Sequence, residues 1–471
     1  MKRRTFLALP GAAAALRSFA QRPSSPPNFV IVTCDDLGYG DVGCFGSRVV
    51  RTPRWDALAA EGMRLDHCYS AAPVCSPSRA GLLTGRTPDR CGIYNWIPEG
   101  NVMHLRREEV TVATLLRRGG YETCVSGKWH LNGRFNDVSQ PQPGDHGFEY
   151  WFATQNNAAP SHENPVNFVR NGTAAGEMKG FSSDLIVNEA IHWMGQRAGS
   201  SKPFFLYVPF HSPHEPVATE EEFVRMYPNA RGRGEALYYG NVSQTDAAFG
   251  RLLDYLKKAG LEDNTFVLFT SDNGPETLDR YPAAWRSHGS PGPFRSMKLS
   301  LYEGGIRVPG IARMPGLIAP GSVLDQPFSG VDLLPTVCAM AGIDPSAPVT
   351  LDGLNMTPHL RGTQMLRRGP LHWHYFNSID APIAALREGD WKILGLSDRH
   401  EESAGGGFEP SRDMPRIRAQ RPQRFELYNL ARDPYERNNL AGREKVRLQT
   451  MRQQLEQVHA GVRAEGYDWR S

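Results

Sequence analysis

Four apolar runs along the chain have the length and composition of buried β-strands. They cover residues 28–36, 121–130, 202–214 and 264–274. Each run ends in polar residues, and between the runs the segments 183–197 and 241–260 carry apolar positions at helical spacing. Because strands alternate with helices, the pattern predicts an α/β fold in which helices sandwich a large, mostly parallel sheet.

The pattern changes after about Arg367. Three short apolar segments follow, at 371–376, 384–395 and 424–430. They predict an antiparallel sheet, and the charged, amphipathic stretch 445–462 predicts a helix beside it. We therefore expect a catalytic α/β domain over 27–366 and a smaller C-terminal α+β subdomain over 367–471. Residues 397–423 are rich in Gly, Arg and Glu, so we expect a long mobile loop or a disordered insertion there.

The N-terminal residues 1–20 have the organisation of an export signal. A basic head precedes an apolar run at 6–16, and the segment ends in a small-x-small pattern at Ser18-Phe19-Ala20. The run is too short to cross a bilayer, and Arg3-Arg4 resembles a twin-arginine leader. We expect a periplasmic or secreted protein without stable membrane insertion; an uncleaved N-terminal anchor remains the alternative.

Charge and cysteine content exclude several classes of protein. The leader holds four basic and no acidic residues, so its removal changes the net charge from +3 to −1. A nearly neutral chain gives no electrostatic footprint for nucleic acid. The seven cysteines form no CxxC pair, which argues against a zinc knuckle or a thioredoxin-like site. We assign no disulfide and expect mostly buried free thiols.

Acidic residues follow two of the predicted strands. Asp35 and Asp36 end the first, and Asp272 and Asn273 follow the fourth. The carboxyl ends of parallel strands lie at one edge of a sheet, where ligands bind. Carboxylate and amide oxygens are hard ligands, which favour Ca²⁺ or Mg²⁺ over zinc. Helix capping by one aspartate of each pair is the structural alternative.

Cys75 stands at the predicted start of a helix. Ser76 is a favourable N-cap, and Pro77 is tolerated at the first helical position. A helix N-terminus stabilises anions, and Arg79 in the first turn can hold an oxyanion. As a thiolate nucleophile, Cys75 would have a lowered pKa there. A soft thiolate nevertheless matches hard-cation ligands poorly, and the cysteine phosphatase loop has an arginine where this chain has Gly81.

The segment CSPSRAGLLTGR at 75–86 matches C-x-P-x-R-x-x-x-x-T-G at every fixed position. The chain thereby resembles the type I sulfatases of the alkaline phosphatase superfamily, such as the arylsulfatases and N-acetylgalactosamine-6-sulfatase. In that family this cysteine is oxidised to Cα-formylglycine, whose hydrated aldehyde is the nucleophile. The resemblance implies an alkaline phosphatase-like fold and extends to the segment ELYNLARDPYERNNLA near the C-terminus.

The resemblance also implies roles for individual residues. It implies a metal site, for Ca²⁺ or alternatively Mg²⁺, made by Asp35, Asp36, Asp272, Asn273 and the formylglycine from Cys75. It implies catalysis by Cys75, Arg79, Lys128, His130, His214 and Lys298. The basic side chains and the cation would hold the sulfate oxygens. His214, with Lys298, would protonate the leaving alcohol, and His130 would take a proton so that sulfate is expelled.

The expected function is hydrolysis of sulfate monoesters, and the expected partners are a sulfated saccharide and a formylglycine-generating enzyme. Polar residues and a tryptophan suit a sugar ring, so we expect substrate contacts from Asn156, Asn157, His162, Trp285, Arg286, His288 and the loop after Ser397. For His288 the alternative to substrate contact is a purely structural role, and we also prefer that role for His211, His372 and His374. The alternatives are a phosphate or phosphonate ester hydrolase of the same superfamily and a silent sulfated-glycan-binding protein.

Overall fold

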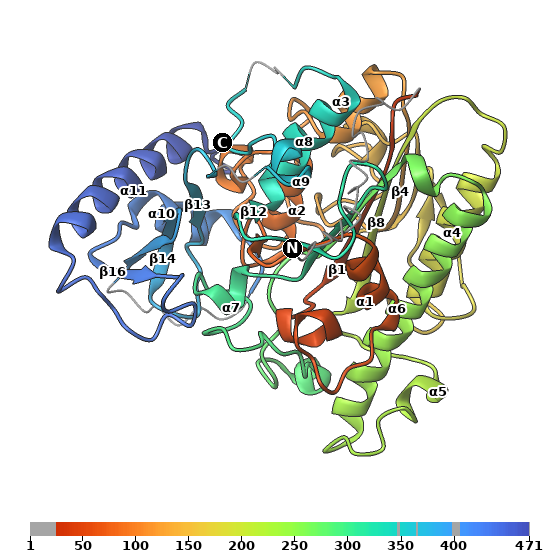
Figure 1. The fold of residues 1–471 in the computed structure, drawn as a ribbon, viewed down its shortest axis with the longest axis horizontal. Helices are drawn as coiled ribbons and strands as arrows, with labels where there is room; N and C mark the ends of the chain where they lie inside the picture. The colour runs from red at the N-terminus through yellow and green to blue at the C-terminus, as the bar shows by residue number, and fades with distance from the viewer. Residues whose placement is uncertain (1–24, 346–348, 364–365, 398–405, 471) are drawn as a thin grey trace, which may run out of the picture.

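The computed structural model describes residues 25–345, 349–363, 366–397 and 406–470. A ten-stranded sheet forms its centre, and a four-stranded sheet stands beside it (Figure 1). The strand order of the large sheet is β11-β2-β10-β9-β1-β8-β4-β5-β6-β7. The predicted export signal at 1–20 lies outside the described residues.

The middle of the large sheet is parallel, as the sequence predicts. Its strands are β1 (Asn28–Asp35), β4 (Glu122–Lys128), β5 (Tyr150–Thr154), β8 (Phe204–Pro213) and β9 (Thr265–Ser271). Val30 in β1 aligns with Leu206 in β8 and with Val267 in β9. Every residue of β1 is buried, because helices cover both faces of the sheet, and this explains the uninterrupted apolar run.

The two edges of the sheet are made by short strands. They are β2 (Met63–Leu65), β10 (Gly310–Arg313), β11 (Ser322–Leu324), β6 (Val169–Arg170) and β7 (Thr173–Ala174). β10 pairs antiparallel with β9, and β6 pairs antiparallel with β5, so the sheet is mixed. A separate parallel pair joins β3 (Cys68–Tyr69) to β12 (Phe328–Ser329).

Two layers of helices enclose the large sheet. Alternate residues of β1 divide between two cores: Phe29 and Ile31 belong to one, and Val30 and Val32 to the other. The first core includes α2 (Cys75–Thr84), α3 (Val112–Arg118) and α8 (Leu333–Ala341). The second includes α1 (Pro53–Glu61), α4 (Ser182–Gly195) and α6 (Arg233–Lys258). Figure 1 shows the two layers on opposite sides of the sheet. The remaining short helices are α5 (Glu221–Val224), α7 (Glu303–Ile306) and α9 (Thr357–Leu360).

Helix α6 begins at Arg233 rather than at the predicted position, Asn241. Ala236 and Tyr238 are buried in the added turns, and Glu235 in the first turn accepts hydrogen bonds from Arg231. Packing of these residues extends the helix beyond the regular amphipathic repeat. Among the described residues, no helix is both long enough and apolar enough to cross a membrane.

The C-terminal sheet is antiparallel, as predicted. It contains β13 (Leu371–His374), β14 (Pro382–Glu388), β15 (Trp391–Leu396) and β16 (Arg424–Asn429). Helix α11 (Lys445–Glu465) covers one face through Met451 and Leu455. On the other face, Trp373 and Leu394 pack with Tyr69 of the large domain. We retain 27–366 and 367–471 as the proposed division of the chain.

The expectation of an unstructured segment over 397–423 is wrong for its second half. Residues Pro410–Ala419 form helix α10, which Glu409 caps by accepting hydrogen bonds from the backbone of Ser411 and Arg412. Met414 and Ile417 of this helix are buried in the main core. A narrow apolar stripe among many arginines therefore suffices to anchor the helix. Residues 398–405 lie outside the described part of the chain.

Candidate active site

The carboxyl ends of four parallel strands bring the predicted site together. Asp35 ends β1, Lys128 ends β4, His214 follows β8, and Asp272 follows β9. The same strand ends lie at one edge of the sheet, so residues far apart in the sequence become neighbours. Their side chains are buried or nearly so, and ionic contacts among them are therefore screened little by water.

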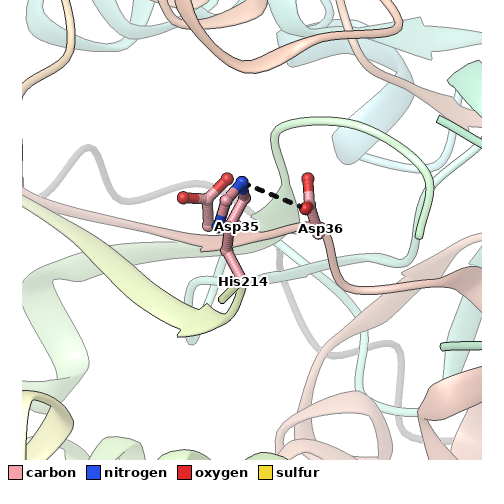
Figure 2. A group of neighbouring side chains, drawn as sticks. All are labelled: Asp35, Asp36 and His214. Carbon is pink, nitrogen blue, oxygen red and sulfur yellow. Dashed lines mark ion pairs between the residues drawn. The ribbon is translucent and has the colours of Figure 1, made fainter. Parts of the chain in front are cut away.

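Asp35 and Asp36 direct two carboxylates toward one point. Oxygens of both residues and a ring nitrogen of His214 all lie within 4.8 Å of one another. Figure 2 shows this group and the 3.5 Å contact between His214 Nε2 and Asp36 Oδ2. Successive strand side chains normally point to opposite faces. Asp36 escapes this alternation because its φ is +65°, in the left-handed region.

Asp272 and Asn273 complete the group from β9. Asp272 Oδ1 accepts a hydrogen bond from the backbone N–H of Asp36 at 3.3 Å. Asn273 Nδ2 donates to Asp36 Oδ1 at 2.7 Å. The two strand ends are therefore joined directly through the residues that the sequence predicts to bind a metal.

Three basic side chains face these acids. Lys128 Nζ lies 2.5 Å from Asp35 Oδ2, and Lys298 Nζ lies 2.7 Å from Asp36 Oδ2. Arg79 Nε donates to Asp272 Oδ2 at 2.9 Å. Each acid thus has its own basic partner. The positively charged donors of these partners lie where they could hold a negatively charged ester group.

Burial and neighbouring charges shift the pKa values of the acids in opposite directions. Burial raises the pKa of Asp36 to about 6, against the effect of Lys298. Burial and the charge of Asp35 raise the pKa of Asp272 to about 7. Burial acts on Asp35 in the same sense, but the positive charge of Lys128 holds its pKa well below the usual range. Asp36 and Asp272 lie close to other buried acids, which repel their negative charge. A divalent cation relieves this repulsion.

The donor set fits a hard divalent cation. Asp35 Oδ1 and Asn273 Oδ1 are buried and accept no hydrogen bond from any described residue. Unpaired buried oxygens are costly, so their presence in one acidic cluster indicates a missing partner. Asp35, Asp36, Asp272 and Asn273 offer carboxylate and amide oxygens, as Ca²⁺ or Mg²⁺ requires.

Cys75 is the first residue of α2, whose N-cap is Val74. The prediction of Ser76 as N-cap is therefore wrong: Ser78 N–H already donates to Val74 O at 3.1 Å, and Ser76 Oγ accepts from Ile97 N–H. The expected lowering of the thiol pKa is also wrong. Burial raises the pKa of Cys75 to about 11, although Lys128 and Lys298 oppose the rise. The unmodified thiol is a poor nucleophile in this setting.

Two histidines lie beside this group. Burial lowers the pKa of His214 to about 3 and holds that of His130 well below its usual value. His130 Nε2 lies 3.2 Å from Ile97 O, whereas its Nδ1 has no partner among the described residues. Both rings are therefore neutral near pH 7, which is the form that accepts a proton.

The predicted substrate residues differ widely in exposure. Trp285 is 44% exposed, and the Arg286 guanidinium stacks on its ring. Asn156 is half-buried and His288 is also half-buried. His162 is only 1% exposed and packs against His211 in the interior, so its ring offers little surface to a substrate.

Asn157 lies deeper in the site than its sequence context suggests. Its Oδ1 accepts a hydrogen bond from Lys128 Nζ at 3.0 Å, and its Nδ2 lies 3.2 Å from His214 Nδ1. His214 Nδ1 is also 2.7 Å from Glu215 O. These contacts hold the lysine and the histidine in a fixed relation.

Two further residues near the basic groups are not among those predicted from the sequence. Glu276 Oε2 lies 3.4 Å from Lys298 Nζ and also binds Arg280 at 2.6 Å. The i,i+4 spacing of Glu276 and Arg280 was a local signal, although the pair lies in a loop rather than in a helix. Tyr375 follows β13 and donates to Asn95 Oδ1 at 3.0 Å. Its ring belongs to the same buried cluster as Cys75, and no local sequence pattern marks it because the C-terminal sheet places it there.

Comparisons with known proteins agree with this geometry. The family model described as Sulfatase matches residues 27–343. N-acetylgalactosamine-6-sulfatase of Mus musculus is 32% identical over 454 residues, which covers 90% of this chain and 84% of the mouse protein. Arylsulfatase A of Homo sapiens is 34% identical over 441 residues, covering 88% and 84%. The crystal structure of Ps i-CgsB in complex with k-i-k-neocarrahexaose superposes with a TM-score of 0.78 at 27% identity and covers 94% of both chains. The chain therefore belongs to the sulfatase family of sulfate ester hydrolases.

Proposed function

We propose that this enzyme removes sulfate from a sulfated saccharide and that Cys75 is the precursor of a formylglycine. The observation that carries the proposal is the position of Cys75, buried at the start of α2, where Lys128 and Lys298 are the positive charges that most lower its pKa. Oxidation would replace a thiol of raised pKa with an aldehyde, whose hydrate supplies an oxygen nucleophile suited to hard-cation surroundings.

Asp35, Asp36, Asp272 and Asn273 would hold the divalent cation, for which we propose Ca²⁺, with Mg²⁺ as the alternative. The bound cation would supply positive charge for a sulfate oxygen and lower the pKa of a hydroxyl beside it. The orphaned oxygens of Asp35 and Asn273 support this assignment.

The chain's own basic side chains would bind and orient the sulfate ester. Arg79, Lys128 and Lys298 are at most 3% exposed, so their donors act where water is largely excluded. Burial opposes the charged form of Lys298, but Asp36 and Glu276 raise its pKa well above the usual value. The ammonium thus stays charged near pH 7.

The two histidines would move protons at defined atoms. His130 Nδ1 would accept a proton, because Nε2 faces the carbonyl of Ile97. His214 would act through Nε2, because Nδ1 faces the carbonyl of Glu215. His214 is neutral at rest, so we propose that the Lys298 ammonium supplies the proton and that His214 Nε2 passes it to the leaving alcohol oxygen.

Several observations support a saccharide as the leaving group. An exposed tryptophan with polar neighbours suits the apolar face and hydroxyl groups of a sugar ring. The similar proteins include N-acetylgalactosamine-6-sulfatase, and Ps i-CgsB was crystallised in complex with a neocarrahexaose. We propose direct substrate contacts from Asn156, Trp285 and His288, of which Trp285 is the most accessible, and an indirect contribution from His162, which is 1% exposed.

Mass spectrometry of the tryptic peptide Leu65–Arg79, followed by turnover assays, tests the proposal. Protein produced with a formylglycine-generating enzyme should carry an aldehyde at position 75 and hydrolyse an aryl sulfate and sulfated oligosaccharides. Phenyl phosphate is the control that separates sulfate from phosphate ester chemistry. Full conversion to the aldehyde without sulfate ester turnover would contradict the proposal and favour a silent binding protein.

We propose a periplasmic or secreted location, reached by the twin-arginine pathway. Residues 1–20 support this through Arg3-Arg4 and the short apolar run. A reporter fused to residues 1–24 should be exported in cells with an intact twin-arginine pathway. An Arg3→Lys/Arg4→Lys leader should retain the reporter in the cytoplasm, and its continued export would contradict the proposal.

A further inference from the structure

A basic groove lies between α10 and α11, away from the residues of the active site. Its volume is about 580 Å³. We define the groove by the residues that line it, Arg418, Arg421, Pro422, Leu455, Glu456, His459, Ala460, Arg463 and Ala464. In Figure 1, α11 lies along the outer side of the C-terminal sheet.

Backbone carbonyls at the ends of α10 and α11 hold the three guanidinium groups of the groove in place. Arg463 Nη2 donates to Ile417 O at 2.8 Å and to Arg418 O at 2.7 Å. Arg421 Nη1 donates to Arg418 O and Gln420 O, each at 2.8 Å. Arg418 Nη2 donates to Gly466 O at 3.0 Å. Backbone carbonyls therefore fix the guanidinium groups but do not neutralise their charge.

Acidic groups compensate little of this charge. Glu456 lines the groove but is paired with Arg452 at 2.8 Å. Asp468 Oδ2 lies 3.9 Å from Arg418 Nε and binds Arg470 more closely, at 2.7 Å. Within the described ranges, Arg421 Nε and Nη2 have no acceptor. Burial lowers the pKa of Arg463 and the positive charge of Arg421 lowers it further, whereas the carboxylate of Asp89 opposes the shift.

A buried histidine adds a second, independent observation. His459 lines the groove and is 5% exposed, yet neither of its ring nitrogens has a hydrogen-bond partner in the part of the chain that the structure describes. A buried, unpaired imidazole is costly. Three preorganised guanidinium groups and an unpaired ring donor at one groove form the arrangement that binds a tetrahedral oxyanion.

We propose that this groove binds a sulfate group of a sulfated saccharide chain, at a position separate from the ester that is cleaved. The inference rests on the proposed function, since a polysaccharide substrate carries further sulfate groups. Pro422, Leu455 and Ala460 give the groove an apolar part against which a sugar ring can pack. The groove would hold the polymer while the active site acts on another residue, and would raise the local concentration of ester groups.

Hydrogen–deuterium exchange with the full chain carrying Cys75→Ala tests the inference, because the variant binds without turnover. The probes are a sulfated hexasaccharide, its desulfated counterpart and sodium sulfate. Some of the local openings that permit exchange also release the bound ligand. Exchange through these openings becomes about tenfold slower when the ligand is present at about ten times its Kd. The sulfated hexasaccharide should protect both peptides 410–423 and 71–86, and the desulfated form neither.

The Arg418→Gln/Arg421→Gln variant in the same background should lose protection of 410–423, with its hexasaccharide Kd raised about tenfold. Both arginines are exposed, and exchange of β1 checks that the fold persists. Arg447→Gln, an exposed position on α11 outside the groove, is the matched control and should bind as the parent does.

The two peptides separate failure of the inference from failure of the proposed function. Protection of 71–86 without protection of 410–423 would overturn the groove assignment alone. Protection of neither peptide would overturn both. If sodium sulfate protected 410–423 as strongly as the hexasaccharide at equal sulfate concentration, the assignment to a saccharide chain would be wrong.

Discussion

The Arg79 guanidinium and the Asp272 carboxylate are joined by two short contacts, 2.9 Å from Nε to Oδ2 and 2.7 Å from Nη2 to Oδ2. Arg79 Nη1 also donates to Lys128 O at 2.9 Å. Both side chains are at most 1% exposed, so the pair acts in a poorly hydrated environment. It fixes the first turn of α2, and with it Cys75, relative to the acidic cluster at the end of β9.

Replacement of Arg79 by lysine tests this relationship. One ammonium cannot reproduce the planar set of donors, so we expect both weaker positioning and poorer binding of the sulfate oxygens. The kcat for an aryl sulfate should fall about 10²–10³-fold, as for the loss of one positioned transition-state donor. Arg134→Lys, an exposed position, serves as the control. A kcat near that of the parent would show that Arg79 contributes only charge.

Removal of divalent cations should abolish turnover and lower the Tm. Without a cation, the acidic cluster keeps its mutual repulsion and its unpaired oxygens. Ca²⁺ at about 100 times its Kd should restore about 2.7 kcal/mol of stability, measured as a Ca²⁺-dependent rise in Tm. Asn273→Ala should reduce that rise. Equal activity and equal Tm in EDTA and in Ca²⁺ would argue against the metal site.

Acid stability should depend on His146, which is 1% exposed and has Nε2 3.1 Å from Leu105 O. Burial lowers its pKa to about 4, from about 6.5 when unfolded. As the pH falls, the unfolded chain takes up the proton first. The contribution of neutral His146 to the free energy of unfolding is therefore complete above about pH 6.5. It is lost as the pH falls through about 4, and the loss is at most about 3 kcal/mol.

His146→Gln should accordingly flatten the dependence of Tm on pH between about 6.5 and 4. His192→Gln, at an exposed position on α4, should leave the dependence unchanged. If the two variants retained the same slope as the parent, burial of His146 would not be the source of acid sensitivity.

A buried ion network should join the C-terminal sheet to the large domain. Lys392 Nζ lies 2.9 Å from Glu303 Oε1 and 2.9 Å from Glu436 Oε1, and all three side chains are fully buried. Lys392→Met leaves two buried acids without their cation, so the free energy of unfolding should fall by about 3–5 kcal/mol. Urea denaturation measures the change, with exposed Lys445→Met as control. A loss below about 1 kcal/mol would mean that protonation of Glu436, whose pKa burial raises to about 7, relieves the network.

The amino-acid sequence by itself determined the main sheet and the chemical character of the site. Buried parallel strands need long apolar runs, and such runs mark β1, β4, β8 and β9 without reference to the rest of the chain. The polar residues directly after these strands had to meet at one edge, because parallel strands share their direction. The pattern around Cys75 supplied the family resemblance.

The tertiary structure alone decided properties that depend on burial. A helix N-terminus lowers a thiol pKa, but the packing around Cys75 excludes water and raises it. His162 was predicted from its polar surroundings to contact substrate, but it packs in the interior. The basic groove combines residues of α10 and α11. Tyr375 reaches the site because a separate sheet docks there. Local sequence patterns specify which face of an element is apolar, whereas desolvation and charge pairing depend on which elements finally meet.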